Sequence, residues 1–304
     1  MDLNGILVVN KPKGMTSHDV VQRLRRTYSM KKIGHTGTLD PMVDGVLVVC
    51  FGRATKLAEY LTNETKVYRA TICFGISTDT EDITGTILEK KAITKVKAKE
   101  ICATFEKTLQ TFIGIYEQIP PMYSAVKING KKLYEYARNA EIVERKPRTL
   151  EVYKMEMDTT SIKTDEVEQT LTCTFDVTAS KGLYVRTLCV DIGKKFNLPA
   201  TMSNLTRLQS GNYTVTDAIP LAEIMEQKPE LRGLAEMTLD MQTVEVAAEV
   251  AAKLRVGYRL PHYFVGEEKI AGIFLVREEK TRDMIGIYAQ SEKYPDKYAS
   301  IKIL

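Results

Sequence analysis

The amino-acid sequence predicts an α+β fold in which a mixed or antiparallel β-sheet is flanked by helices. Segments with strand-like and helix-like patterns follow one another without the strict alternation of a parallel α/β sheet. At 304 residues the chain is longer than a typical single domain, and the polar stretch 226–234 has the composition of a linker. We therefore expect a large domain over residues 1–235 and a small, mostly β domain over residues 240–304.

The first elements alternate between apolar runs and helix signals. Residues 6–9 are apolar and end at a turn that contains proline and glycine, which predicts a buried strand. Thr16 or Ser17 can cap the helix that follows, whose apolar residues are spaced to face the core. Residues 45–51 predict a second buried strand, and residues 54–61 a second helix.

The middle of the chain has clearer periodicities. From residue 67 to residue 74 the side chains alternate, so Tyr68 shares one strand face with apolar residues. A capped helix is predicted over residues 94–109. Asn129 and Gly130 form the strongest hairpin signal in the chain.

The later segments complete the expected elements. Residues 150–157 and 170–177 alternate as half-buried strands joined by a polar loop. After Gly182 a helix is predicted, because its apolar residues recur at helical spacing. Beyond the linker, a helix around residues 246–254 precedes three short apolar runs, at residues 270–276, 284–289 and 298–304.

The composition indicates a cytoplasmic globular protein with no membrane association. Hydrophobic residues make up 44% and charged residues 27%, and the apolar runs are too short to cross a bilayer. The N-terminus lacks the basic start and cleavage region of a signal peptide. The five cysteines form no CxxC pair and the three histidines are widely separated, so we expect no metal site. Walker A, GxGxxG, HExxH and GxSxG motifs are absent, so we expect no cofactor.

Basic residues gather in two stretches. Residues 1–56 hold nine Lys or Arg against four Asp, and residues 120–150 hold seven against three Glu. If the fold brings these stretches together, they form a basic face suited to a phosphate backbone. The alternative is that they solvate exposed surfaces, as charged residues usually do.

The stretch GHTGTLDPMVDGVL, from residue 34 to residue 47, places Asp40 just before a buried strand. The proline that follows favours an extended backbone at Asp40 and so fixes the direction of its side chain. Glycines at positions 34 and 37 permit tight turns or the close approach of another molecule. The alternative is that Asp40 only forms an Asp-Pro turn, which is a structural role and needs no chemistry. Without a cofactor, any chemistry at Asp40 is acid-base or covalent carboxylate catalysis.

This stretch resembles the catalytic motif of the TruB family of tRNA pseudouridine synthases, which isomerise uridine 55 in the T loop. Further segments resemble that family in the same order over about residues 4–211: VNKPKGMTSHDVV, KVYRATICFGISTDTEDITG, QIPPMYSAVKINGKKLYEYAR, SKGLYVRTLCVDIG and LTRLQSG. The resemblance implies the pseudouridine synthase catalytic fold, with an RNA-gripping insertion at about residues 120–150. Residues from about 240 onward match only the general pattern of a small PUA-like RNA-binding domain.

The resemblance implies a reaction that breaks the bond between uracil N1 and ribose C1′, turns the base and rejoins it through C5. In that reaction Asp40 attacks the sugar or the base, or assists glycal formation. Arg186 is its implied cationic partner through a forked salt bridge, which keeps the aspartate ionised in a dry pocket. By the same resemblance Tyr68 stacks on the uracil and is a candidate to remove a ribose proton, while Tyr184 and Leu205 wall the pocket.

The resemblance also implies how the RNA is held. A uridine stacked in a folded T loop cannot be reached, so the enzyme must flip it out. His35 matches the histidine that occupies or props the vacated space. Lys131 and Lys132, in the insertion, are expected to bind the T-stem-loop of tRNA, and Lys11 a phosphate. We expect a monomer that requires no protein partner and no cofactor.

Two other functions stay open. One is a catalytic subunit guided by a small RNA and accessory proteins, because that related branch shares the GHTGTLDP-like motif. The other is an RNA chaperone that holds and refolds tRNA without chemistry. The long KINGKKLYEYAR segment favours the stand-alone enzyme. A pure RNA-binding protein would not require Asp40, Tyr68 and Arg186 together.

Overall fold

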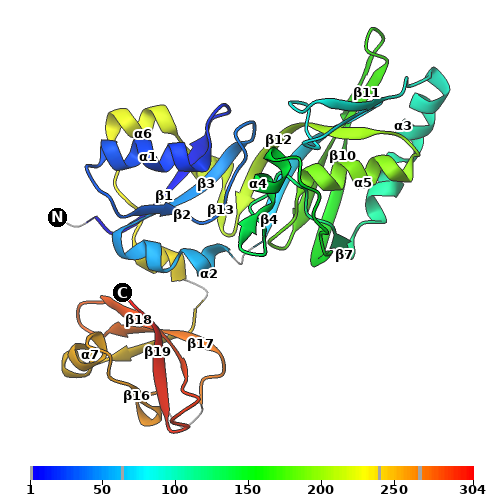
Figure 1. Ribbon diagram of the computed structural model, residues 1–304. Helices are drawn as coiled ribbons and strands as arrows, with labels where there is room; N and C mark the ends of the chain where they lie inside the picture. Colours follow the sequence, from blue (N-terminus) through cyan, green and yellow to red (C-terminus); the bar gives the residue numbers. More distant parts are fainter. Residues whose placement is uncertain (1–2, 63–64, 239–240, 266–268) are drawn as a thin grey trace.

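The computed structural model describes residues 3–62, 65–238, 241–265 and 269–304. A ten-stranded sheet and a five-stranded sheet account for most of its strands (Figure 1). The strands of the large sheet are β1 (Gly5–Lys11), β2 (Ile33–His35), β3 (Asp44–Phe51), β4 (Lys66–Phe74), β7 (Gly114–Gln118), β10 (Arg148–Asp165), β11 (Thr170–Ala179), β12 (Ala200–Ser210), β13 (Tyr213–Thr214) and β14 (Ile219–Pro220).

The large sheet is mixed, which confirms the predicted fold class. Its strand order is β14-β1-β3-β12-β4-β11-β10-β7, with β2 beside β3 and β13 beside β12. The pairs β1–β14 and β3–β12 are parallel. The other described pairs of this sheet are antiparallel. Strands from distant parts of the sequence therefore lie side by side, and β12 joins the N-terminal strands to β4.

Helices cover one face of the large sheet. Figure 1 shows helices over the β1 half and over the half that contains β4, β11 and β10. Their buried apolar side chains form one continuous core with the strands. These helices are α1 (Ser17–Thr27), α3 (Lys95–Gln110), α5 (Val185–Lys195) and α6 (Leu221–Gln227).

The first helix begins where its sequence predicts. The Thr16 hydroxyl accepts a hydrogen bond from the Asp19 backbone N–H at 3.0 Å, and the Asp19 carboxylate accepts one from the Thr16 N–H at 2.8 Å. This reciprocal capping box satisfies two backbone donors that a helix start leaves without partners. The helix start is therefore well defined, and it supports the loop that contains Asp40.

Residues 6–9 of β1 and 46–51 of β3 are apolar because both faces of these strands are covered. Leu7 and Val9 face the helices, whereas Ile6 and Val8 face a second apolar cluster. That second cluster includes Ile287 of the C-terminal sheet. A strand buried on both sides needs no alternation of polar and apolar residues.

The hairpin predicted at Asn129 and Gly130 is present. It joins β8 (Lys127–Ile128) to β9 (Lys131–Lys132), and α4 (Leu133–Arg138) follows directly. Backbone φ is 51° at Asn129 and 81° at Gly130. A two-residue turn of this kind requires positive φ at both positions, which Asn-Gly adopts readily.

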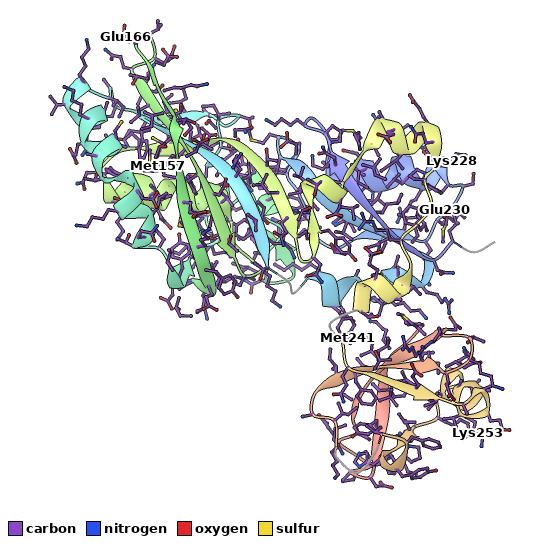
Figure 2. The ribbon with its side chains drawn as sticks, turned by 180° about the vertical axis from the view of Figure 1, so that it is seen from behind. Met157, Glu166, Lys228, Glu230, Met241 and Lys253 are labelled. Carbon is purple, nitrogen blue, oxygen red and sulfur yellow. The ribbon has the colours of Figure 1, made fainter. Side chains whose placement is uncertain are left out.

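The polar loop expected between residues 157 and 170 is mostly strand. β10 continues to Asp165, with a break in register between Asp158 and Lys163, and pairs with β11 almost to its end. Figure 2 shows this long hairpin projecting from the sheet with Glu166 at its tip. The polar composition reflects exposure of both strand faces, not a loop.

The stretch 226–234 is not a linker between domains. The backbone N–H and C=O groups of Ile6 and Arg232 hydrogen-bond to each other at 2.9 and 3.0 Å, so this segment packs against β1. Figure 2 shows Lys228 and Glu230 beside the large sheet, whereas Met241 lies close to the small one. The 3-10 helix η3 (Leu234–Thr238) follows in the sequence. The helix expected over residues 54–61 is divided into η1 (Gly52–Lys56) and α2 (Ala58–Thr62).

The small sheet has the order β15-β17-β18-β19-β16 and its own apolar core. Arg53 forms an ion pair with Asp283 at 3.1 Å, and Lys56 donates to the Ile303 carbonyl at 2.6 Å, so this sheet is docked on η1. The elements of this C-terminal region are β15 (Thr243–Val246), α7 (Ala248–Arg255), β16 (Leu260–Pro261), η4 (His262–Phe264), β17 (Ile273–Glu278), β18 (Met284–Gln290) and β19 (Lys297–Ile303).

Among the described residues no helix is long and apolar enough to cross a membrane.

Three short elements complete the chain. β5 (Ile76–Thr78) and β6 (Ile87–Lys90) pair as a separate two-stranded sheet next to β4. The 3-10 helix η2 (Val215–Asp217) leads from β13 to β14. The turn between β5 and β6 contains the acidic stretch that meets Arg186, described below.

Candidate active site

A cavity of about 410 Å³ opens beside the loop that contains Asp40. This volume is within the range of small-ligand sites. Its walls come from the loop at residues 36–40, from β4 and β12, from residues 123–125 and from the turn that precedes α5. Five of the predicted site residues line it: Asp40, Tyr68, Tyr184, Arg186 and Leu205.

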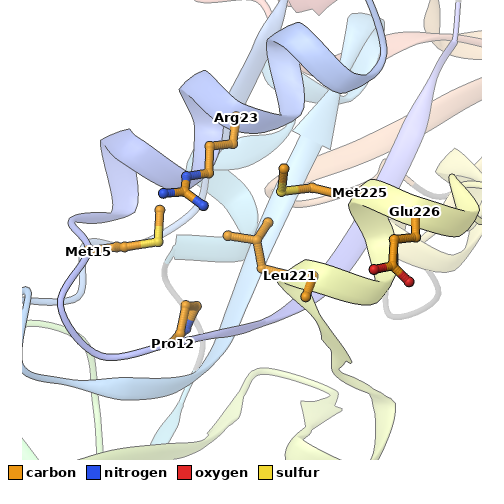
Figure 3. Close-up of a pocket in the computed structure, with 7 residues that line it drawn as sticks. Pro12, Met15, Arg23, Leu221, Met225 and Glu226 are labelled. Atoms are coloured by element: carbon orange, nitrogen blue, oxygen red, sulfur yellow. The ribbon is translucent and has the colours of Figure 1, made fainter.

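A second cavity, of about 430 Å³, lies between α1 and α6. Figure 3 shows Arg23 and Glu226 at this site, among mostly apolar side chains. None of the predicted site residues lines it. The cavity beside Asp40 is therefore the one that carries the candidate chemistry.

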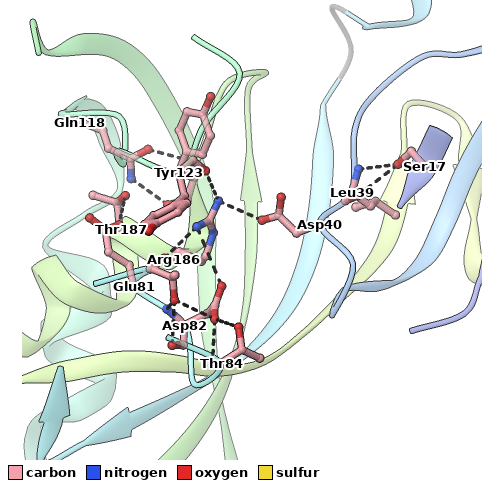
Figure 4. Close-up of polar contacts among 12 residues, drawn as sticks. Ser17, Leu39, Asp40, Glu81, Asp82, Thr84, Gln118, Tyr123, Arg186 and Thr187 are labelled. Atoms are coloured by element: carbon pink, nitrogen blue, oxygen red, sulfur yellow. Dashed lines mark hydrogen bonds and ion pairs between the residues drawn. The ribbon is translucent and has the colours of Figure 1, made fainter. Parts of the chain in front are cut away.

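The loop that contains Asp40 is fixed by the start of α1. The backbone N–H of Leu39 donates to the Ser17 hydroxyl at 2.8 Å, as Figure 4 shows. The Gly14 N–H donates to the Pro41 carbonyl at 2.8 Å, and the Val43 N–H to the Asp40 carbonyl at 3.1 Å. These bonds hold the backbone on both sides of Asp40, while its side chain stays 40% exposed.

Arg186 meets Asp40 at the cavity, although the two residues are far apart in sequence. One guanidinium nitrogen, Nη2, lies 3.0 Å from Asp40 Oδ2, and the arginine side chain is only 6% exposed (Figure 4). The predicted forked salt bridge is wrong in its geometry. Nη2 also donates to the Tyr123 carbonyl and Nη1 to the Thr80 carbonyl, both at 2.8 Å, so the second arm of the fork is bound elsewhere.

The acidic turn at residues 79–85 provides the other half of the arginine's surroundings. Asp82 is buried, and its Oδ2 lies 3.9 Å from Arg186 Nη1. Its Oδ1 accepts hydrogen bonds from the Thr84 N–H at 2.9 Å and from the Thr80 hydroxyl at 3.0 Å. The sequence analysis assigned no role to this acidic turn. Its alternation of Thr and Asp is typical of side chains that bond to a nearby backbone, which was the available signal.

Glu81, in the same turn, reaches away from the cavity. Its backbone φ is 63°, and its carboxylate accepts a hydrogen bond from the Thr187 hydroxyl at 2.5 Å. Burial raises the pKa of Glu81, while the Thr187 hydrogen bond and the nearby Arg186 oppose that shift. The Met202 N–H donates to the Glu81 carbonyl at 3.1 Å, which joins the turn to β12.

Tyr68, Tyr184 and Leu205 surround the space next to the ion pair. Tyr68 lies near the start of β4, and Leu205 lies on the neighbouring strand β12 with 6% of its surface exposed. Tyr184 is the N-cap residue of α5. Its backbone N–H and C=O bond to the Gln118 side chain at 2.8 and 3.0 Å, which fixes the turn in front of Arg186.

The sequence analysis missed Arg207. This residue lines the cavity from β12, yet it is only 2% exposed. Its Nε donates to the Val46 carbonyl at 2.7 Å and its Nη2 to the Gly37 carbonyl at 3.2 Å. Burial lowers the pKa of Arg207, and the phenol of Tyr68 opposes that shift. In the sequence it stands in an ordinary alternating strand, and nothing local marks it as buried.

His35 lies in β2 and is not among the residues that line the cavity. Its Nδ1 is buried and has no hydrogen-bond partner among the described residues. Burial lowers the pKa of His35, and the charge of Arg207 adds to the effect. The role predicted for His35 at the vacated base position stays a prediction.

Lys131 and Lys132, the two lysines predicted to bind RNA, have partners within the insertion. Lys131 forms an ion pair with Glu141 at 2.8 Å, and its ammonium lies 4.5 Å from the centre of the Tyr136 ring. The Lys132 ammonium lies 3.3 Å from the Tyr134 hydroxyl. Tyr134 also lines the cavity, so this segment forms part of its wall. RNA binding by the two lysines stays a prediction.

Lys11, which we expected to contact a phosphate, is instead an internal cation. Its side chain is fully buried, and its ammonium donates to the carbonyls of Pro12, Met15 and Pro41 at 2.9, 2.6 and 3.5 Å. Burial lowers the pKa of Lys11 to about 8, although Asp44 and Asp40 oppose the shift. The expectation of a phosphate contact is wrong, because the chain folds back over the ammonium and ties β1 to the Asp40 loop.

Lys11→Met tests this placement through the pH dependence of stability. As the pH rises from about 8 towards 10.5, the folded protein has lost the Lys11 proton that the unfolded chain still binds, so the folded state gains stability. Relative to the variant, the unchanged protein is expected to gain roughly 1–2 kcal/mol between about pH 7 and about pH 9.5. Urea unfolding of both proteins measures this. An equal difference at both pH values would contradict a buried ammonium.

Family models and curated relatives match this chain over most of its length. The family model for the TruB family pseudouridylate synthase N-terminal domain matches residues 25–185, and that for the tRNA pseudouridylate synthase B C-terminal domain matches residues 186–244. Curated relatives named tRNA pseudouridine synthase B from Oceanobacillus iheyensis and Staphylococcus saprophyticus are each 42% identical. The alignments cover 90% and 98% of this chain, and 92% and 97% of the relatives.

Solved structures share the fold at low identity. A chain in a Cbf5-Nop10-Gar1 complex is 22% identical with a TM-score of 0.66, and the match covers 99% of this chain and 84% of that one. A chain in an H/ACA RNP bound to a substrate RNA containing 2′-deoxyuridine is 20% identical with a TM-score of 0.64, at the same coverage. With family models that match most of its length and relatives at 42% identity, the chain belongs to the TruB family of pseudouridylate synthases.

Proposed function

We propose that the protein isomerises uridine 55 in the T loop of tRNA to pseudouridine, as a monomer that acts in the cytoplasm without a cofactor. The observation that carries this proposal is the ion pair between Asp40 and Arg186 in the wall of a cavity that also contains Tyr68. The relatives named tRNA pseudouridine synthase B support tRNA as the substrate.

The exposure of the two charges suits this chemistry. The Asp40 side chain is 40% exposed towards the cavity, whereas its cationic partner is 6% exposed behind it. A substrate can therefore reach the carboxylate without displacing the arginine. The ionised carboxylate is the form that can attack a carbon atom or accept a proton.

The isomerisation needs no external reactant. The bond from C1′ to N1 breaks and a bond from C1′ to C5 forms, while C5 loses a proton and N1 gains one. Asp40 attacks the sugar or the base, or assists glycal formation. Tyr68 stacks on the uracil, and in the glycal route it removes a ribose proton and returns it when C1′ bonds to C5. Tyr184 and Leu205 wall the pocket around the base, and His35 props the space that the flipped nucleotide leaves.

The insertion at residues 120–150 is the proposed contact with the T-stem-loop. Tyr123, Ser124, Ala125 and Tyr134 from this segment line the cavity, so RNA bound there lies next to Asp40. Lys131 and Lys132 supply positive charge on the same segment. The flipped nucleotide and the stem would then be held by one continuous surface.

The domain organisation is part of the proposal. Residues 1–235 form the catalytic domain, and residues 240–304 form a PUA-like RNA-binding domain. A separate sheet and a separate apolar core in the C-terminal part support this division. Beyond residue 240 the chain has ten Lys or Arg against nine Asp or Glu, so binding there would depend on shape more than on net charge.

The proposal is tested with the purified protein and an unmodified tRNA transcript. We expect one pseudouridine per tRNA, at position 55, when the product is mapped by chemical labelling and primer extension. A transcript with cytidine at position 55 is the matched control and is expected to remain unmodified. Absence of pseudouridine from the uridine transcript would contradict the proposal.

The same assay separates the two alternatives. A guided catalytic subunit would require a small RNA and accessory proteins, so turnover by the protein alone excludes that function. The Cbf5-containing neighbours are 20–22% identical and show the fold only. A folding chaperone would refold tRNA without modifying it. Refolding by a protein that carries Asp40→Asn would show that this activity exists beside the catalytic one.

A further inference from the structure

Arg207 is a buried cation for which the described part of the chain offers no carboxylate partner. It lies on β12, between β3 and β4, and is 2% exposed. Two backbone carbonyls accept its hydrogen bonds, those of Val46 and Gly37. Among the residues that the structure describes, no Asp or Glu forms an ion pair with it.

Such an arrangement is costly for folding. A charge removed from water loses solvation, and only good hydrogen bonds together with an opposite charge compensate for that loss. Carbonyl dipoles replace part of the solvation of Arg207, and an apolar side chain would fill the same strand position without the cost. The guanidinium is therefore better explained by the chemistry of the cavity than by stability.

The group that faces Arg207 in the cavity is the phenol of Tyr68. The two residues are direct cross-strand partners in the β4–β12 ladder, and both line the cavity. The phenol and the guanidinium interact electrostatically. Through Gly37, the same guanidinium holds the loop that ends at Asp40. One cation thus connects the candidate base to the backbone that carries the candidate nucleophile.

We propose that Arg207 is a positioning residue that directs the Tyr68 hydroxyl into the cavity and stabilises negative charge on its oxygen. The inference rests on the proposed function. A phenol must give up its own proton, here to solvent water in the open cavity, before it can accept one from the ribose. An adjacent cation offsets the negative charge that this leaves on the oxygen. Arg186 is then the cationic partner of Asp40, and Arg207 is the cationic partner of Tyr68.

Other charged and titratable groups also face this space. Lys66 and Lys181 add positive charge and Asp40 adds negative charge. Arg186 is held by its own acceptors, at Asp40 and at two carbonyls. The phenols of Tyr123, Tyr134 and Tyr184 complete the titratable lining. The experiments below therefore change Arg207 alone and leave these groups in place.

The first experiment is a double-mutant cycle measured as single-turnover rate constants with the tRNA transcript. Arg207→Gln is expected to lower the rate constant about 100-fold, as the loss of one preorganised donor does. In a Tyr68→Phe background the same change is expected to cost less than about threefold, because the oxygen through which Arg207 acts is gone. Equal losses in both backgrounds would overturn the proposal.

Two further variants separate positioning from structure. Arg207→Lys keeps the charge without the fork and is expected to retain about tenfold more activity than Arg207→Gln. Arg69→Gln is the matched control, because Arg69 lies next to Tyr68 on β4 but pairs with Asp176 on the opposite, exposed side. It is expected to leave the rate constant unchanged. A lysine variant as slow as the glutamine variant would argue against a role for the charge.

The second experiment does not depend on the substrate. Tyrosine labelled with ¹³C at Cζ reports the electrostatic surroundings of each phenol by NMR, and Tyr68→Phe identifies the Tyr68 signal. The Tyr68 signal is expected to change its chemical shift in Arg207→Gln, because the cation beside the phenol is gone, and to keep its position in Arg69→Gln. An unmoved Tyr68 signal would overturn the inference. Failure of the proposed function would show separately, as absence of pseudouridine from the unchanged protein.

Discussion

Asp40→Asn is expected to lower the single-turnover rate constant by at least about 10⁴-fold while the Kd for tRNA changes less than about threefold. The amide has the shape of the carboxylate and can still accept a hydrogen bond from Arg186, so the cavity keeps its form. It carries no negative charge, and it neither attacks carbon nor accepts a proton at neutral pH. The loss should therefore fall on the chemical step.

The measurement combines rapid-quench pseudouridine formation with filter binding of labelled tRNA. Asp176→Asn is the matched control, since Asp176 also pairs with an arginine, Arg69, through hydrogen bonds of 2.8 Å. That pair is exposed on the side of the sheet away from the cavity, so both readouts should be unchanged. If Asp40→Asn retained a tenth of the rate, Asp40 would not be the essential carboxylate.

Local sequence patterns predicted most elements because they report which faces are buried. The capped helix at α1, the alternation of β4 and the Asn-Gly hairpin each depend on residues close together in the chain. The long β10–β11 hairpin was missed at its outer end, because a strand exposed on both faces has the composition of a loop. The stretch 226–234 looked like a linker, yet its backbone pairs with β1.

The candidate site was predicted less completely than the fold. Asp40, Tyr68 and Arg186 were identified from the family resemblance, and the ion pair between Asp40 and Arg186 is present. Lys11 was misjudged and Arg207 was missed for the same physical reason. Both are cations whose solvation is replaced by backbone carbonyls. Those carbonyls come close to the cations only when the chain is folded. Side-chain type and spacing carry no information about such carbonyls.

The arrangement of the two cavity arginines links fold to chemistry. Arg186 comes from the first turn of α5 and Arg207 from β12. Both contact the Asp40 loop, Arg186 at the Asp40 carboxylate and Arg207 at the Gly37 carbonyl. Each guanidinium bonds to backbone carbonyls from separate segments, so each also fixes the distance between those segments. Changes at either arginine are therefore expected to affect geometry and charge together, and experiments must separate the two.

Arg186→Lys is expected to lower the rate constant about 10²- to 10³-fold and to destabilise the fold by about 3 kcal/mol. The guanidinium bonds in three directions at once, to Asp40 and to the carbonyls of Thr80 and Tyr123. An ammonium is a single point with three protons and cannot span these acceptors, even though the charge is kept. The buried Asp82 would also lose its neighbouring guanidinium.

The matched control is again the exposed pair, because Arg69→Lys makes the same substitution opposite Asp176. Its effect on the free energy of unfolding is expected to stay below about 1 kcal/mol, since solvent screens an exposed pair. Urea unfolding and single-turnover kinetics on both variants measure the contrast. If Arg186→Lys kept its rate constant within tenfold of the unchanged protein, charge alone would suffice beside Asp40. The fixed, three-way geometry of the guanidinium would then have no part in the chemical step.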